Sequence, residues 1–278
     1  MNENIIKVNG ISFVSGISKK FDTDLFRVKS ILEKPEITAA DRMELIIIYA
    51  PAFHTSGKIE GITSYDSSAH SCTFCNACRK AAENNPAHIC GMCYDIAQEN
   101  YKVNSLNRHS LNMLIMSSVE FTETELSRLS VSKINRINSS GDTPNKTYAL
   151  NMLRLAKIND FAKFAYWAKN TRDVIAACDE IGKPENMILI QSSIIIGRPA
   201  KKAKYFDYVF TVYPTKEMTA AAIETGSNEC NGKKCMECGF KCYFGTHAGN
   251  NNIAEYLRGV NTEKRKEIVK YLETAGRV

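Results

Sequence analysis

The spacing of hydrophobic residues changes several times along the chain of 278 residues and predicts alternating helices and strands. Hydrophobic residues at helical spacing predict helices over 94–101, 105–116, 148–158, 173–181 and 216–224. Runs of β-branched and aromatic residues predict strands over 134–137, 161–167, 187–191 and 205–212. This alternation is typical of right-handed βαβ units, so the sequence predicts an α/β fold with a parallel sheet.

The ends of the chain add smaller elements. A strand is predicted over 11–14, and 39–49 is predicted to be a helix or a helix–strand junction. A last amphipathic helix is predicted from Asn261 to near Gly276. Thr122, with Glu125 three residues later, has the capping-box pattern of a short helix. Small polar residues over 64–81 predict a loop that wraps a metal. We divide the chain into an N-terminal segment (1–62), a core (63–225) and a C-terminal part (226–278).

Composition supports a folded protein of the cytoplasm. Hydrophobic residues make up 44% and charged residues 24%, as in ordinary globular proteins. The first ten residues lack the basic start and apolar stretch of a signal peptide, and the apolar run over 43–51 is too short to cross a membrane. A net charge of +6, without a basic run, permits a nucleic-acid partner but does not require one. In a reducing compartment, the ten cysteines are expected to bind metal, not to form disulfides.

The cysteines fall into two groups with metal-ligand spacing. The first contains two C-x-x-C pairs and a fifth thiol: Cys72, Cys75, Cys78, Cys90 and Cys93. The second lies in the string CNGKKCMECGFKC and contains Cys230, Cys235, Cys238 and Cys242. A two-residue gap lets both sulfur atoms turn toward one ion, and sites made of thiolates alone suit iron-sulfur clusters and zinc. Iron-sulfur is our first interpretation, with zinc as the alternative.

The remaining cysteine and the histidines carry weaker signals. Cys178 lies alone in a predicted helix and is interpreted as a small buried apolar residue. Three histidines beside the cysteine groups are candidates to replace or contact a thiol: His70, His88 and His247. His54 and His109 are expected to be structural or exposed.

A small-residue turn follows the strand predicted over 134–137. In the string RINSSGD, the last three residues are Ser140, Gly141 and Asp142. The carboxyl ends of parallel strands line the ligand crevice, so these residues are candidates for cofactor binding. The alternative is an ordinary turn in which Asp142 caps the next helix and Pro144 starts it. The ends of the next two strands, 167–170 and 191–193, would line the same rim.

Taken in order, these motifs resemble the phage gene product 88 family, which is itself similar to a divergent radical S-adenosylmethionine enzyme. The resemblance covers roughly residues 64–247 and rests on the cysteine loop that ends in Cys93 and Tyr94, the R-x-x-x-S-G-D strand end, and the late cysteine group followed by His247. It implies a partial TIM-barrel-like repeat, a [4Fe-4S] cluster that chelates S-adenosylmethionine, and cofactor contacts from Ser140, Gly141 and Asp142.

The chain departs from that family at the cluster motif. The usual C-x-x-x-C-x-x-C run is absent, so several sets of three ligands are open. Cys90 and Cys93 with either Cys75 or Cys78 are the preferred set, and the late group would hold a second, auxiliary cluster. Two other functions remain as alternatives: a zinc-stapled α/β module that binds nucleic acid, and an iron-sulfur redox or structural protein without S-adenosylmethionine chemistry.

Overall fold

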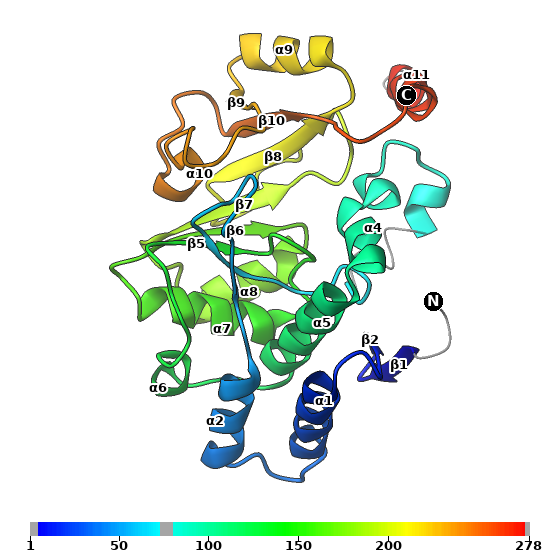
Figure 1. Cartoon of the computed structure of the whole chain (residues 1–278). Helices are drawn as coiled ribbons and strands as arrows, with labels where there is room; N and C mark the ends of the chain where they lie inside the picture. The colour runs from blue at the N-terminus through cyan, green and yellow to red at the C-terminus, as the bar shows by residue number, and fades with distance from the viewer. Residues whose placement is uncertain (1–4, 73–79, 276–278) are drawn as a thin grey trace.

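The computed structural model describes residues 5–72 and 80–275 (Figure 1). These residues form a two-stranded hairpin, one large sheet and helices packed around them. The hairpin consists of β1 (Ile5–Val8) and β2 (Ile11–Val14), which pair antiparallel. Two helices follow it, α1 (Lys19–Leu32) and α2 (Ala39–Ile48). Helix α2 begins with a capping box in which Thr38 and Asp41 satisfy each other's backbone N–H groups.

The large sheet has eight strands in the order β3-β4-β5-β6-β7-β8-β10-β9. Its strands are β3 (Ala52–Phe53), β4 (Thr63–Tyr65), β5 (Ile134–Ile137), β6 (Lys163–Ala168), β7 (Met187–Ser192), β8 (Tyr208–Tyr213), β9 (Asn228–Cys230) and β10 (Asn252–Tyr256). Strand β3 pairs antiparallel with β4, and every other neighbouring pair is parallel. The prediction of an α/β fold with a parallel sheet is therefore confirmed. The edge strands β3 and β9 are not paired with each other, so the described part of the sheet is open and forms no closed barrel.

Helices cover one face of this sheet. They are α5 (Val103–Ser118), α7 (Lys146–Lys157) and α8 (Thr171–Ile181), and Figure 1 shows α7 and α8 together beneath the green strands. Phe164 and Tyr166 of β6 and Leu189 of β7 are fully buried in the core on this side. Strand residues alternate between the two faces, which is why these positions recur at every second residue. The short helix α6 (Glu123–Leu126) has the predicted capping box between Thr122 and Glu125.

The segment 228–247 contributes to covering the opposite face. Its helix α10 (Lys241–Phe244) contacts β6 and β7, and its Tyr243 is buried in a second core with Ile190 and Tyr208. Three thiols of the segment belong to the partly buried rim of this core: Cys230, Cys235 and Cys242. A parallel sheet needs both faces covered, and here a cysteine-rich segment takes part in this covering.

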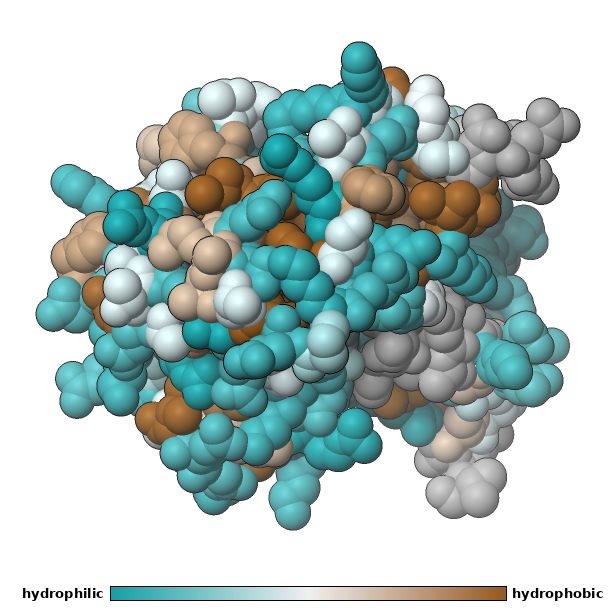
Figure 2. Space-filling view, turned by 90° about the horizontal axis from the view of Figure 1, so that it is seen from below, coloured by the Kyte–Doolittle hydropathy of each residue, from teal (hydrophilic) through white to brown (hydrophobic). Residues whose placement is uncertain are grey.

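The remaining elements lie near the carboxyl ends of the strands or at the edge formed by β9 and β10. They are the 3-10 helix η1 (Ile89–Met92), α4 (Tyr94–Tyr101), α9 (Lys216–Glu224) and α11 (Thr262–Ala275). Seen from below the view of Figure 1, the molecule is mainly hydrophilic, with hydrophobic side chains in small separate groups (Figure 2). Within residues 5–72 and 80–275, no helix has the length and apolar character needed to traverse a bilayer.

Five short strands were not predicted: β1, β3, β4, β9 and β10. Strand β4 lies at the start of a region expected to be a loop. Its small polar residues Thr63 and Ser64 do not give the hydrophobic pattern by which a strand is predicted. Strand β10 follows a polar stretch and is short. Strands β4 and β10 both pair within the main sheet, and strands from all three predicted segments of the chain therefore share one sheet.

Candidate functional site: a cavity at the carboxyl ends of the parallel strands

A cavity of about 1710 Å³ opens where the central strands end. It is lined by Asp66 after β4, residues 138–142 after β5, residues 167–169 at the end of β6, and Ser192 of β7. Both cysteine groups also reach it, through Cys90 and Cys93 on one side and through Cys230, Cys235, Cys238 and Cys242 on another. This is the place where α/β sheets bind ligands. The predicted strand-end motif and six of the nine predicted thiols therefore line one cavity.

The loop after β5 is tied to the end of β4. The Asp66 carboxylate accepts hydrogen bonds from the backbone N–H groups of Ser139 (2.7 Å) and Ser140 (3.0 Å), and from the Ser139 hydroxyl (2.6 Å). The Ser67 hydroxyl donates to the carbonyl of Asp142 at 2.6 Å. Gly141 has φ of 74°, and a Cβ atom there would lie 2.2 Å from the Ser67 Oγ. Glycine is therefore required by conformation and by the close approach of Ser67.

Asp142 uses its carboxylate to join β5 to β6. It accepts hydrogen bonds from the backbone N–H groups of Thr143 (2.8 Å), Lys169 (3.1 Å) and Asn170 (3.1 Å), and its side chain is almost fully buried. Burial raises the pKa of this carboxyl. The charge of Lys169 and the backbone donors act in the opposite direction, but burial is the larger influence. The helix that follows begins after Asn145, which is its N-cap, so the alternative in which Asp142 caps it is wrong.

A histidine–carboxylate network forms another part of the cavity wall. His109 Nδ1 lies 2.9 Å from Glu99 Oε1, and Glu99 also accepts the backbone N–H groups of Ala69 and His70. Burial works to lower the pKa of His109, but the Glu99 hydrogen bond and the charge of Asp66 outweigh it, so the pKa is raised. Glu99 of α4 thereby fixes the backbone that leads into the first cysteine group.

His54 continues this wall on the β3 side. Its Nε2 lies 2.7 Å from the Ser64 hydroxyl, which donates to Asp66 at 2.5 Å. Sequence reasoning favoured structural or exposed roles for His54 and His109, yet both line the cavity. Its position next to β4 would have indicated that His54 lies at the site, but β4 itself was not predicted from the sequence.

The first thiol group is defined as the five predicted thiols Cys72, Cys75, Cys78, Cys90 and Cys93, of which Cys75 and Cys78 lie outside the described residues. Cys72 and Cys90 are buried and pack together with Ile89, although 18 positions separate them in the chain. Cys93 is half-buried at the N-terminus of α4. The backbone N–H of Cys90 donates to Nδ1 of His88 at 3.3 Å, so this predicted histidine positions the turn that carries Cys90. His70, the other flanking histidine, has a buried Nε2 without a hydrogen-bond partner among the described residues.

The second thiol group is defined as Cys230, Cys235, Cys238 and Cys242. Burial, and after it the neighbouring Cys230 and Cys235, raise the pKa of Cys242 to about 12. His247 Nε2 lies 3.3 Å from the sulfur of Cys242, and the Cys238 thiol donates to the carbonyl of Cys235. Burial also raises the pKa of Cys230 and of Cys235, so it favours the protonated form of these two thiols and of Cys242.

The loop between β3 and β4 holds this second group in place. The backbone N–H of Cys235 donates to the carbonyl of Lys58 at 2.8 Å. Two ion pairs flank this bond, Lys58 with Glu255 at 2.7 Å and Lys234 with Glu60 at 2.6 Å. The group is thus anchored to strands β3, β4 and β10 as well as to the sheet face.

The donor chemistry of both groups fits a thiophilic metal, but the side chains of the described residues are not arranged around a metal position. Within the described residues, no three or more His, Cys, Asp or Glu side chains form a group that could hold an ion. Two of the five thiols of the first group, Cys75 and Cys78, lie outside the described residues. The second group has all four thiols at one wall of the cavity. Metal binding would require the thiols to lose their protons and turn inward.

Cys178 behaves as expected from its isolation. It lies in α8 in the main core, 2% exposed, and burial raises the pKa of its thiol to about 11. It belongs to neither thiol group and serves as a matched control for both.

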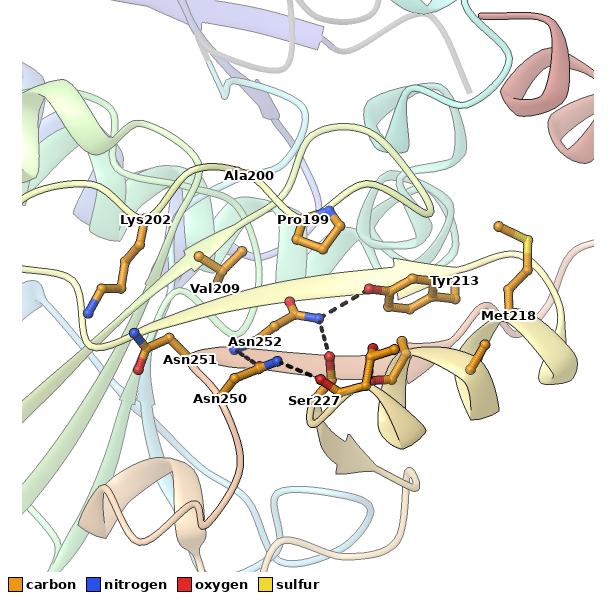
Figure 3. Close-up of a pocket in the computed structure, with 13 residues that line it drawn as sticks. Pro199, Ala200, Lys202, Val209, Tyr213, Met218, Ser227, Asn250, Asn251 and Asn252 are labelled. Carbon is orange, nitrogen blue, oxygen red and sulfur yellow. Dashed lines mark hydrogen bonds between the residues drawn. The ribbon is translucent and has the colours of Figure 1, made fainter. Parts of the chain in front are cut away.

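A smaller cavity of about 590 Å³ lies between α9 and strands β8 and β10 (Figure 3). Its polar side chains are paired with one another: the Asn252 amide donates to the Tyr213 hydroxyl (3.1 Å) and to the Ser227 hydroxyl (3.0 Å). Thr211 donates to the Asn252 oxygen at 2.8 Å. Because these groups already satisfy each other, the large cavity is the better candidate for a functional site.

Comparisons with known proteins assign no relatives to this chain. No protein-family model, curated protein or solved structure matches it. The functional interpretation therefore rests on the residues and geometry described above.

The Gly141 geometry yields a stability prediction. Gly141→Ala adds a methyl group that collides with Ser67, whereas Gly10→Ala in the β1–β2 turn, at a similar φ of 79°, meets nothing within 4 Å. Both substitutions strain the backbone, by about 1–2 kcal/mol. We expect Gly141→Ala to lower the free energy of unfolding, measured by urea denaturation, by at least about 1 kcal/mol more than Gly10→Ala, since overpacking adds its own cost. Equal losses would show that the loop does not press on Ser67.

Proposed function

We propose that this protein is an iron-sulfur enzyme that resembles radical S-adenosylmethionine enzymes and acts on a substrate bound in the large cavity. The observation that carries the proposal is that two thiol groups, far apart in sequence, line the same cavity at the carboxyl ends of parallel strands. Strands β4, β5, β6, β7, β8 and β10 lie in chain order within that sheet. An ordered, open array of this kind agrees with a partial TIM-barrel-like repeat and with the resemblance to the phage gene product 88 family.

The first thiol group would hold the cluster that meets the cofactor. Cys90 and Cys93 with Cys75 or Cys78 would supply three thiolates, which leaves one iron open to S-adenosylmethionine. Such a cluster, when bound, supplies the electron that cleaves a carbon–sulfur bond of the sulfonium. Cys93 lines the cavity and is the N-cap residue of α4, where an open metal position would face the cofactor.

The loop 140–142 would position the cofactor beside this group. Its residues line the cavity, and Ser140 and Gly141 are fixed by Asp66 and Ser67. Asp142 already accepts three backbone N–H groups, so in this proposal it holds the loop and offers no unoccupied carboxylate. The cofactor would therefore contact the backbone and hydroxyl groups of the loop.

The second thiol group would hold an auxiliary cluster. Four thiols at one wall leave no open position once all are bound, which suits a structural or electron-transferring role. Zinc in both groups, with or without nucleic-acid binding, is the alternative that metal analysis separates from this proposal.

Metal content tests the two thiol groups separately. Protein purified without oxygen should contain iron and sulfide and should be brown, with a broad absorption band in the visible range. Cys93→Ser and Cys235→Ser should each lose part of the iron, and the double variant should lose nearly all of it. Cys178→Ser should keep the full content. A colourless protein that carries stoichiometric zinc would overturn the iron-sulfur assignment.

Cofactor cleavage tests the enzyme against a redox protein. With dithionite as the reductant, the wild-type protein should convert S-adenosylmethionine into methionine and 5′-deoxyadenosine, measured by chromatography. Cys93→Ser should reduce the rate by at least about a hundredfold, the upper end of the loss for residues that only support a ligand, because the cluster loses one of its own three thiolate ligands. Cys178→Ser should cleave like the wild type. A full complement of iron without cleavage would leave an iron-sulfur protein that lacks S-adenosylmethionine chemistry.

A further inference from the structure

Arg136 lies on the strand β5 and extends from the sheet face that carries the second thiol group. Its guanidinium stacks over the ring of Trp167 on the neighbouring strand β6, with 4.1 Å between the guanidinium carbon and the ring centroid. Both residues line the large cavity. A guanidinium at this distance is attracted to the face of the indole, and this attraction uses none of its N–H donors.

This guanidinium has no anionic partner among the described residues. Arg136 forms no ion pair or side-chain hydrogen bond there, and its Nε is buried without a partner. Lys58, a cation of the same cavity, shows the usual arrangement, because it pairs with Glu255 at 2.7 Å. Asp66, a carboxylate that acts on Arg136 electrostatically, is already engaged by Ser139, Ser140 and Ser64.

A second donor without a partner lies nearby. The hydroxyl of Tyr243 is buried and makes no hydrogen bond of normal geometry among the described residues, where the Cys235 thiol is its polar neighbour. The Tyr243 side chain lines the same cavity. The Tyr243 and Trp167 rings are 5.9 Å apart, so the two unpaired donors flank one indole. Buried polar groups are normally hydrogen-bonded, and two adjacent exceptions indicate a group that is supplied from outside the chain.

We propose that Arg136 and Tyr243 form an oxyanion site that binds a carboxylate or phosphate of the molecule on which the protein acts. A planar guanidinium matches both of these groups through paired N–H donors. The cavity of about 1710 Å³ exceeds the roughly 300–1,000 Å³ typical of sites for one small molecule, which leaves room for a second ligand. As an assignment of substrate class the inference rests on the proposed function, whereas the anion site itself needs only Arg136, Tyr243 and the cavity.

Trp167 makes this site directly observable. It is the only tryptophan of the chain and lies beneath the guanidinium, so its fluorescence reports on anions that bind to Arg136. Titration at low ionic strength with sodium phosphate and, separately, with sodium acetate should give a saturable change with at least one of them. Saturation with phosphate alone identifies a phosphate group, and saturation with acetate alone identifies a carboxylate. Saturation with both identifies a site that accepts either oxyanion.

Variants assign the response to these two donors. Arg136→Met should raise the anion concentration at the midpoint of the fluorescence titration by at least about tenfold. Arg136→Lys keeps the positive charge but loses the planar guanidinium with its paired N–H donors, so its effect should be intermediate. Tyr243→Phe removes one oxygen atom and should raise the midpoint by about threefold or more. Lys264→Met, which removes another positive charge from the cavity lining, should change it less than about twofold.

Three results would overturn the oxyanion site: no fluorescence change with either anion, unchanged midpoints in both Arg136→Met and Tyr243→Phe, or an equal loss in Lys264→Met. Thermal unfolding followed by circular dichroism checks that each variant is folded. If Arg136→Met does not fold, Tyr243→Phe still tests the oxyanion site. Iron content and S-adenosylmethionine cleavage are measured on the same preparations. If anions do not bind but iron content and S-adenosylmethionine cleavage are as expected, only the oxyanion site is rejected. If anions bind but iron or cleavage is absent, only the proposed enzyme function is rejected.

Discussion

Packing of the cysteine-rich segment 228–247 against one face of the parallel sheet is the interaction on which the site depends. The other face is covered by α5, α7 and α8 in the main core, and this segment contributes to the covering that the second face requires. Tyr243 and Phe240 supply apolar contact area, with ring centroids 5.9 Å apart in an edge-to-face arrangement. The same packing brings four thiols, and the hydroxyl of Tyr243, to the cavity beside Arg136. A structural requirement of the sheet thereby places chemical groups at the site.

The cavity wall is held from several directions at once. Asp66 and Asp142 join the ends of β4, β5 and β6 through backbone N–H groups, while Glu99 fixes the entry to the first thiol group. Removing one partner from such a buried network costs more than the bond contributes in isolation, since the remaining group stays desolvated. The loops that line the cavity are accordingly positioned before any ligand arrives. Preorganisation of this kind lowers the entropic cost of binding.

Much of the scaffold could be predicted from the sequence because its helices and central strands have strong periodicity. The strand over 134–137 and the helix over 216–224 occur within the predicted bounds, and the capping box at Thr122 is present. Strand β4 could not be found, because Thr63 and Ser64 are polar and their burial depends on partners more than 60 positions away. The open sheet follows from the unpaired edges of β3 and β9, which no local pattern encodes.

The site was predictable in its residue types but not in its connections. The spacing of cysteines marks the thiols, and Ser140, Gly141 and Asp142 do reach the cavity. That the carboxylate of Asp142 faces the backbone of Lys169 and Asn170 is set by the pairing of β5 with β6, which is a property of the fold. Arg136 drew attention only as the start of a motif, since its lack of an anionic partner is visible only once the surrounding residues are in place.

The central claim, that thiolates from the two groups hold iron-sulfur centres, is tested most directly by X-ray absorption at the iron and zinc edges of protein purified without oxygen. The account predicts an iron edge with a first shell of sulfur and a second shell of iron. A shell of oxygen and nitrogen without sulfur, or a zinc edge with sulfur at about 2.3 Å and no iron, would contradict it.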